Sequence, residues 1–363
     1  MDIATSRSIF NTTNLQLAFD EEKDVAVSSG KIISDSLREK YELIVGYWVV
    51  FFVSALGVIT NSLVMVVFIR QGFRDSVNVS LFSIAVWDQI KCVAGVVYRL
   101  YGPIGLVDSV SGVTWRWASR PVLVYLPIFA GYVSYGMATY VSIERCLSVS
   151  MPFKVKSLVN PRLTTGAMVV LSVFILGSFS PVFFVYTVTY TFNSYYNASI
   201  PRVTAGVLYF AEGGVILKLY KYLGIIYPAI FCTAMTLSSA IIVYHLRRSA
   251  ANFRPDKGKD TEGDAFCSTS AKMSARDVKV TKMLLVVILV YMMDFFPRLC
   301  VYLASLVEPE FFVYKRLHNL MRVTSNTLWV LDFLNASVNF FIFMGMSTNF
   351  KTTFKKTFQC CKP

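Results

Sequence analysis

Seven long apolar stretches divide this chain of 363 residues and constrain its fold more than any other feature. They lie at 44–69, 77–97, 121–143, 164–186, 223–244, 283–304 and 323–346. About 20 helical residues cross a bilayer core about 30 Å thick, so each stretch is long enough to span it. Hydrophobic residues make up 55% of the chain and charged residues 16%, which is too apolar for an ordinary soluble domain. The sequence therefore predicts an all-α membrane protein with a seven-transmembrane helix bundle.

Lysine and arginine gather in the loops on one side of the predicted bundle, and this side is expected to face the cytoplasm. We therefore expect a multi-pass protein of the plasma membrane, with the N-terminus extracellular and the C-terminus cytoplasmic. Residues 1–43 would form an extracellular segment, 44–346 the transmembrane domain with a cytoplasmic third loop at about 247–282, and 347–363 an interfacial helix and tail. The net charge of +13 then reflects topology and the lipid membrane, and no nucleic-acid partner is expected.

Several modification sites follow from this topology. Asn11 and Asn197 are glycosylation sequons on the predicted outside, although sequons are common by chance. The N-terminal segment has no basic run followed by a short apolar core, so we expect no cleavable signal peptide. Phenylalanine recurs every four residues from Phe350 to Phe358, with lysines between. This pattern predicts a short amphipathic eighth helix in the membrane interface, with Cys360 and Cys361 as palmitoylation sites; a solvated basic tail is the alternative.

Polar residues and prolines stand at defined places within the apolar stretches. A charge near the bilayer centre costs about 2.5 to 3.5 kcal/mol, so each one needs a partner or a function. Glu144, Arg145 and Cys146 close the third stretch, and Pro152 and Phe153 follow shortly after. The other members of the pattern are Asn61 in the first stretch, Asp88 in the second, Pro228 in the fifth, Pro297 in the sixth and Asn339 in the seventh. Each is a weak signal alone, so the information lies in their shared order and spacing.

In this order and spacing the residues resemble the rhodopsin-like (class A) G-protein-coupled receptors over about 44–361, nearly the whole chain. The Glu-Arg-Cys triplet and the Asn-Phe-Phe-Ile-Phe ending of the seventh stretch most resemble invertebrate FMRFamide-type neuropeptide receptors and molluscan chemosensory receptors. The resemblance implies a receptor for an extracellular peptide or small chemosensory ligand. On binding, the sixth helix would move outward and a heterotrimeric G protein would be activated.

The resemblance also implies a switch at the inner end of the bundle. Arg145 would be held at rest by Glu144 and by Asp277 at the base of the sixth helix, and would be released on activation. The predicted switch consists of Glu144, Arg145, Asp277, Phe295, Pro297 and Asn339, and the predicted G-protein contacts are Arg145 and Phe153. The alternatives are that Arg145 snorkels to the interface and that Asp277 is a solvated loop charge.

By the same resemblance, polar residues on four helices would line a pocket for Na⁺, an ion that suits oxygen ligands. These residues are Asp88, Ser134, Asn335, Ser337 and Asn339. The alternative is that they form ordinary hydrogen bonds between helices, each worth well under about 2 kcal/mol. No other cofactor is expected.

The outer halves of the helices would form the ligand cavity. The candidates are Lys91, Tyr98, Arg99, Asp294, Arg298, Tyr302, Trp329 and Asp332. Unpaired bases would favour an anionic ligand and unpaired acids a cationic peptide side chain, although Arg298 is as well explained by internal pairing with an acid. Pro127 stands where amine receptors carry an Asp, and the seventh stretch has no Lys for retinal. Peptide or small chemosensory ligands remain.

Departures from the family pattern leave other functions open. The predicted exterior loops contain no cysteine for the usual disulfide, and Asn339 is not followed by the usual Pro and Tyr. A receptor-like protein that binds but signals weakly is therefore one alternative. A membrane transporter that uses the intramembrane charges is another, although the chain has no internal repeat. An enzyme is not expected, because the chain has only two His and no visible pairing of a nucleophile with a base.

Overall fold

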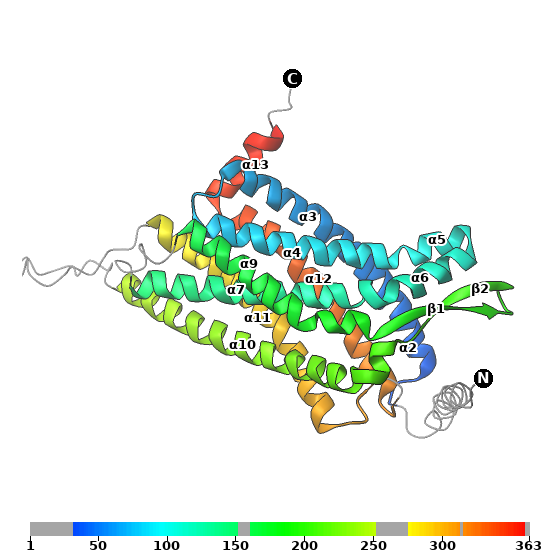
Figure 1. Ribbon diagram of the computed structural model, residues 1–363. Helices are drawn as coiled ribbons and strands as arrows, with labels where there is room; N and C mark the ends of the chain where they lie inside the picture. Colours follow the sequence, from blue (N-terminus) through cyan, green and yellow to red (C-terminus); the bar gives the residue numbers. More distant parts are fainter. Residues whose placement is uncertain (1–31, 152–159, 252–274, 313–314, 360–363) are drawn as a thin grey trace, which may run out of the picture.

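The computed structural model describes residues 32–151, 160–251, 275–312 and 315–359, and these are almost entirely helical (Figure 1). The first half comprises α2 Asp35–Tyr41, η1 Glu42–Val49, α3 Val50–Gln71, α4 Ser76–Arg99, α5 Tyr101–Val107, α6 Ser109–Leu123 and α7 Tyr125–Ser150. The second comprises α9 Pro161–Phe179, η2 Ser180–Phe184, β1 Tyr186–Asn193, β2 Ala198–Ala205, η3 Tyr209–Gly213, α10 Gly214–Ala251, α11 Ala275–Val307, α12 His318–Met346 and α13 Thr348–Gln359.

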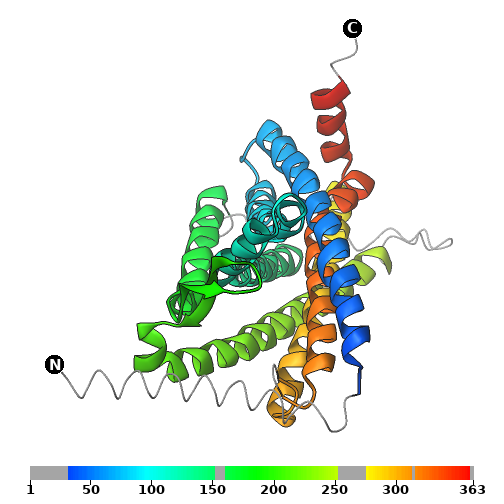
Figure 2. The same ribbon diagram turned by 90° about the vertical axis from the view of Figure 1, so that its right-hand side faces the viewer.

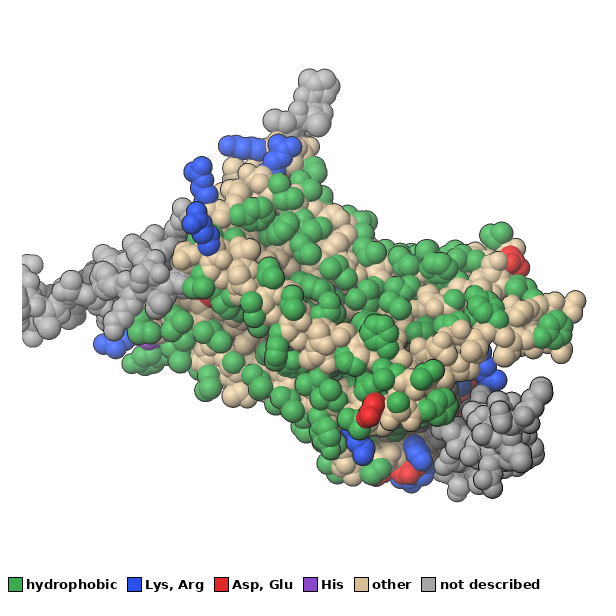
Figure 3. Space-filling model, viewed as in Figure 1, with side chains coloured by type: hydrophobic (Ala, Val, Ile, Leu, Met, Phe, Trp, Pro, Cys, Tyr) green, Lys and Arg blue, Asp and Glu red, His purple; other side chains and the backbone are tan. Residues whose placement is uncertain are grey.

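Seven helical stretches of the described residues are long and apolar enough to cross a membrane. They are Asp35–Gln71, Ser76–Val107, Ser109–Ser150, Pro161–Phe184, Tyr209–Arg248, Val278–Val307 and His318–Met346. Figure 3 shows the matching surface, with charged side chains near the two ends of the visible face and hydrophobic ones across its middle. The predicted seven-transmembrane bundle is therefore confirmed.

Polar caps fix where several of these helices begin. Asp75 before α4, Asp108 before α6 and Asn160 before α9 each accept a hydrogen bond from a backbone N–H in the following first turn. Pro161 takes the first helical position of α9, where its missing N–H costs nothing. At the end of α3, Gly72 adopts a φ of 79°, a conformation that suits glycine and turns the chain toward α4.

The centre of the bundle is formed by α4 and α7. α4 packs against α3, α7, α9 and α12, and α7 packs against α9, α10 and α11 as well. Figure 2 views the molecule from the end that carries the strands, and it shows α3, α9, α10 and α12 arranged around α4 and α7. We call this end, with β1, β2, α5 and α6, the hairpin end, and the opposite one, where α13 packs on α3 and α12, the α13 end.

The hairpin end differs most from the sequence expectations. The third crossing does not begin at Pro121: α6 precedes it, Pro121 lies in the last turn of α6, and Val124 separates α6 from α7. The first helical stretch begins at Asp35, ahead of the expected boundary at 44. The loop before α10 contains an antiparallel hairpin in which Tyr186 pairs with Ala205 and Asn193 with Ala198.

Aromatic side chains fill the core between α7, α9, α10 and α11. Phe129 stacks on Phe179 with ring centroids 4.8 Å apart, and Tyr135 lies against Phe295 at 3.9 Å. α13 is anchored by the buried Phe350, whose ring lies 5.6 Å from that of Phe68 in α3. Such aromatic contacts contribute about 0.5 to 1.5 kcal/mol each beyond the area they bury. The placement of α13 in a membrane interface stays a prediction.

Candidate functional site

The Glu144 and Arg145 pair lies at the α13 end of the bundle. Glu144 is buried in α7, and its Oε1 accepts a hydrogen bond from the Ser76 hydroxyl of α4 at 2.8 Å. The Arg145 guanidinium donates to the same carboxylate oxygen. The structure thus brings these two predicted switch residues into contact and links them, through Glu144, to the first turn of α4.

Several predicted site residues cannot be placed beside this pair. Asp277 belongs to the first turn of α11, but its side chain lies outside the described part of the chain. Phe153, Asn11, Cys360 and Cys361 also lie outside the described residues. The contact between Arg145 and Asp277, the G-protein contact of Phe153 and the predicted modifications at these positions stay predictions.

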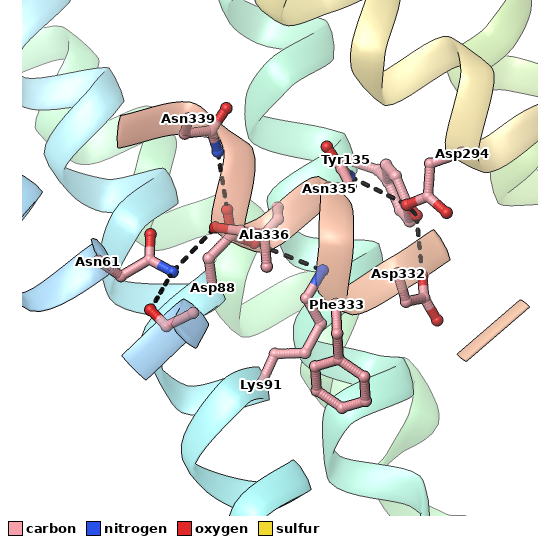
Figure 4. Close-up of polar contacts among 12 residues, drawn as sticks. Asn61, Asp88, Lys91, Tyr135, Asp294, Asp332, Phe333, Asn335, Ala336 and Asn339 are labelled. Atoms are coloured by element: carbon pink, nitrogen blue, oxygen red, sulfur yellow. Dashed lines mark hydrogen bonds and ion pairs between the residues drawn. The ribbon is translucent and has the colours of Figure 1, made fainter. Parts of the chain in front are cut away.

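Asp88 is the centre of a buried network that joins four helices (Figure 4). Its Oδ1 accepts a hydrogen bond from the Ser134 hydroxyl of α7 at 2.9 Å. Its Oδ2 accepts one from the Tyr291 hydroxyl of α11 at 2.9 Å and one from Asn339 Nδ2 of α12 at 3.2 Å. Asn61 of α3 lies nearby and donates to the Ala336 carbonyl at 2.9 Å. The bonds to Asp88 fix the relative positions of α4, α7, α11 and α12, and the Asn61 bond separately links α3 to α12.

Lys91 lies one turn further along α4, and its Nζ is 3.6 Å from Asp88 Oδ1. The Lys91 side chain is 1% exposed and the Asp88 side chain 0%, so solvent does not screen the pair. Lys91 Nζ has no hydrogen-bond partner among the described residues, which leaves Asp88 as its nearest counter-charge. Figure 4 shows the ammonium group pointing toward Asp88 beside α12.

The residues present do not fit the predicted Na⁺ site. Asp88, Ser134 and Asn339 come together, but each carboxylate oxygen of Asp88 already has protein partners and Lys91 supplies the positive charge. Asn335 donates to Asp294 instead, and the Ser337 hydroxyl donates to the Phe333 and Val53 carbonyls. Within the described ranges, no cluster of three His, Cys, Asp or Glu side chains could hold a metal ion.

A second buried network follows between α7, α11 and α12. The Arg298 guanidinium pairs with Asp332 Oδ2, and the Tyr135 hydroxyl lies against Asp294 and, at 3.1 Å, Asp332 Oδ1. Asn335 Nδ2 donates to Asp294 at 3.0 Å. Internal pairing of Arg298 with an acid, the alternative that the sequence left open, is therefore what the structure shows.

A cavity with a volume of about 470 Å³ lies at the hairpin end. It is bounded by η1, the ends of α4 and α6, α5, the start of α7 and α12. Tyr98, Arg99 and Trp329, three of the predicted ligand residues, line it. Four arginines and one acid also line it: Arg99, Arg116, Arg120, Arg322 and Glu42.

The other five predicted ligand residues do not line this cavity. Lys91, Asp294, Arg298 and Asp332 belong to the two buried networks. Tyr302 of α11 faces α10, where its hydroxyl is 3.5 Å from that of Tyr220. Their role in ligand binding is a prediction that the cavity geometry does not favour.

Sequence reasoning missed Tyr135, Tyr291, Arg116 and Arg120. Tyr291 lies three residues before Asp294, so both face the same side of α11, and this spacing was the available signal. Arg116 and Arg120 lie four apart on one face of α6. The sequence signal for the helix that carries them was Asp108, a capping residue whose carboxylate accepts hydrogen bonds from the Val110 and Ser111 N–H groups at 3.2 and 2.9 Å.

Asn197 is exposed at the tip of the β-hairpin, where it has a φ of 46°. An exposed turn is an accessible place for a glycan, so the geometry is compatible with the predicted modification. Glycosylation at this position remains a prediction.

The comparison with protein families gives a match along most of the chain. Residues 48–361 match the model of the serpentine type 7TM GPCR chemoreceptor Srw. No curated protein matches the chain significantly. The matched region contains all seven candidate spans except the first turns of the first one, together with both buried networks. Because the match covers far more than half of its residues, this chain belongs to the Srw family of seven-transmembrane G-protein-coupled chemoreceptors, a class of receptors and not of enzymes.

Proposed function

We propose that this chemoreceptor binds an extracellular peptide or small ligand at its hairpin end and activates a heterotrimeric G protein at its α13 end. The main support for this proposal is that Arg145 pairs with the buried carboxylate of Glu144, which also accepts a hydrogen bond from Ser76 of α4. A charge pair at the mouth of the bundle has two defined states, paired and released, which a switch requires. The rhodopsin-like order of Asn61, Asp88 and Asn339 supports the same mode of action.

The proposal includes the orientation predicted from the loop charges. The α13 end, which carries the basic loops, would face the cytoplasm, and the cavity at the hairpin end would open to the exterior of the plasma membrane. Outward movement of α11 about Pro297 would expose Arg145 to the G protein. The FMRFamide-type resemblance favours a peptide, and a cavity of about 470 Å³ holds a small molecule or a short peptide segment.

Basal nucleotide exchange tests this function before a ligand is known. The full chain would be reconstituted in nanodiscs with a panel of Gα subunits, and GTP analogue uptake would be measured. Glu144→Gln should raise basal exchange, because it weakens the hold on Arg145, and Arg145→Ala should abolish it. Arg162→Ala, an exposed change at the start of α9, is the matched control and should leave exchange unaltered. Exchange no higher than with empty nanodiscs, for the wild type and for Glu144→Gln alike, would refute G-protein activation.

Two other functions remain outcomes of the same preparation. A receptor that binds without signalling would show ligand stabilisation and no exchange, in line with the missing Pro and Tyr after Asn339. A transporter would show tracer flux in liposomes. The geometry does not favour an ion path through the bundle, because the buried charges of the two networks do not line the cavity at the hairpin end.

A further inference from the structure

The cavity at the hairpin end contains an excess of positive charge. Four arginine side chains line it, and Glu42 is the acidic side chain among its lining residues. Glu42 is already committed, since its two carboxylate oxygens accept from Arg322 at 2.8 and 3.1 Å. Three lining arginines therefore have no carboxylate partner within the described ranges: Arg99, Arg116 and Arg120.

Each of these three arginines is held by neutral groups. Arg99 is 7% exposed, and its guanidinium donates to the Gly46 carbonyl at 3.0 and 3.1 Å and to the Gly95 carbonyl at 3.1 Å. The Arg116 guanidinium lies 5.1 Å from the ring of Tyr101, and that of Arg120 lies 5.2 Å from the ring of Trp117. Carbonyl and aromatic contacts orient a guanidinium without cancelling its charge.

Such an arrangement is costly unless something else supplies negative charge. Arg99 is buried, whereas Arg120 is half-buried and Arg116 is exposed, so the charge of Arg99 is the most costly of the three to leave without a counter-charge. Arginine is also the side chain whose planar fork binds carboxylate and phosphate groups with two parallel hydrogen bonds. Trp329, Tyr98, Leu123 and Pro127 give the same cavity aromatic and apolar walls.

We infer that the ligand of this cavity carries an oxyanion, a carboxylate or phosphate, on an apolar body, and that Arg116 and Arg120 bind the oxyanion. Arg99 forms the buried cationic wall behind them. This inference rests on the proposed function, because it assigns the ligand chemistry of the same site. A free organic acid and the headgroup of an anionic lipid offer the same chemistry, so the test must separate these sources.

Matched acid and amide pairs provide the test. The purified chain in phosphatidylcholine nanodiscs would be melted with straight-chain and aryl carboxylates, their primary amides and the corresponding phosphate monoesters. At least one acid should raise the melting temperature while its amide does not. Nanodiscs with phosphatidylglycerol and no added acid form a separate arm, and stabilisation in that arm alone would identify a lipid as the source of the oxyanion. Equal effects of acids and amides, or no effect of any acid or of the anionic lipid, would overturn the inference.

Variants locate the effect. Arg116→Gln combined with Arg120→Gln should weaken binding of the stabilising oxyanion by at least about tenfold, since two charge-assisted contacts are lost. Arg202→Gln, on the exposed edge of β2 and outside the cavity lining, is the matched control and should bind as the wild type does. Undiminished binding by the double variant would overturn the assignment. Oxyanion binding without nucleotide exchange would instead refute the proposed function and leave this inference standing.

A separate observation concerns the core. Lys91 places its ammonium group 3.6 Å from Asp88, in a position that solvent does not reach. We propose that this ammonium takes the part of a bound cation, so that the Asp88 network is closed without Na⁺. A tethered charge needs no binding equilibrium, and its repulsion opposes entry of a second cation.

Sodium dependence tests this second proposal. The melting temperature of the wild type in nanodiscs should be the same in NaCl and in choline chloride of equal concentration. Lys91→Met removes the charge at similar volume and should create sodium-specific stabilisation, which Asp88→Asn in the same chain should abolish. Sodium-specific stabilisation of the wild type would overturn the proposal even if Lys91→Met does not fold. Absence of a sodium effect in a folded Lys91→Met protein would overturn it as well.

Discussion

The core and the hairpin-end cavity both contain basic side chains, but these side chains have different kinds of partner in the two regions. In the core, Lys91 lies beside Asp88 and Arg298 is paired with Asp332. In the cavity, Arg99, Arg116 and Arg120 have only carbonyl and aromatic partners within the described ranges. The basic side chains of the core thus have acidic partners within the chain, whereas those of the cavity would receive theirs from the proposed ligand.

The largest expected effect comes from breaking a matched pair in the core. Asp332→Ala should destabilise the protein by about 3 to 5 kcal/mol, because Arg298 is left buried without its acid. Thermal unfolding in nanodiscs measures the loss. The double replacement Arg298→Met with Asp332→Leu should recover much of it, since no unpaired charge remains. A single variant as stable as the wild type would contradict the matched-pair description.

A smaller loss is expected from removing one hydroxyl of the Asp88 network. Tyr291→Phe deletes a donor at 2.9 Å from a buried carboxylate and should cost about 1 to 3 kcal/mol. Tyr98→Phe is the matched control, since the Tyr98 ring lines the cavity and contacts Tyr101 edge-on, with centroids 5.8 Å apart. Equal melting temperatures of the two variants would show that the network is not a source of stability.

Removing a charge from the cavity should raise the stability of the protein, whereas removing one from the core lowers it. Arg116→Gln removes one of several like charges, so the ligand-free protein should become slightly more stable, by about 0.2 to 1 kcal/mol. Adding salt should stabilise the wild type more than this variant, because salt screens the repulsion. Calorimetric melting at low and high ionic strength measures both effects. A destabilised variant would indicate that Arg116 is structurally paired.

The smallest effect concerns Asp108, the residue that caps the helix carrying Arg116 and Arg120. Hydrogen bonds from the Ser111 side chain and backbone, and from the Val110 backbone, hold the pKa of this exposed carboxyl below its ordinary value of 3.8. Its contribution to stability is therefore complete above that value and is lost as the pH falls through the lowered pKa. The melting-temperature difference between wild type and Asp108→Ala should be constant near neutrality and shrink in acid. A difference that grows toward low pH would contradict the cap.

The bundle itself could be predicted from the sequence because apolar length alone decides which segments cross a membrane. The spacing shared with the family also predicts that Asp88, Ser134 and Asn339 lie together, as they do in the structure. The family spacing also groups Asn335 and Ser337 with Asp88, but the structure does not. Successive residues turn by about 100° around a helix, so Ser337 reaches the Val53 carbonyl of α3 while Asn335 reaches Asp294 of α11.

The cavity was harder to foresee. Two of its four arginines, Arg116 and Arg120, stand on α6, a helix with too many polar residues to be recognised from apolar length. The spacing of three residues places Lys91 and Asp88 on one face of α4, whereas the family resemblance implies an external Na⁺ ion beside Asp88. Both omissions concern side chains in which this chain departs from the pattern it resembles.

The link between Arg99 and Gly46 gives the first helical stretch a direct connection to whatever occupies the cavity. The Gly46 carbonyl belongs to η1, the π-helical stretch near the start of the first span, and it accepts two hydrogen bonds from the Arg99 guanidinium. An arriving anion that draws the Arg99 guanidinium toward itself must compete with a main-chain oxygen, not with a movable carboxylate. Binding of an anion in the cavity would thus displace the backbone of η1, and the N-terminal segment of the bundle would respond to the ligand as well as anchor the chain.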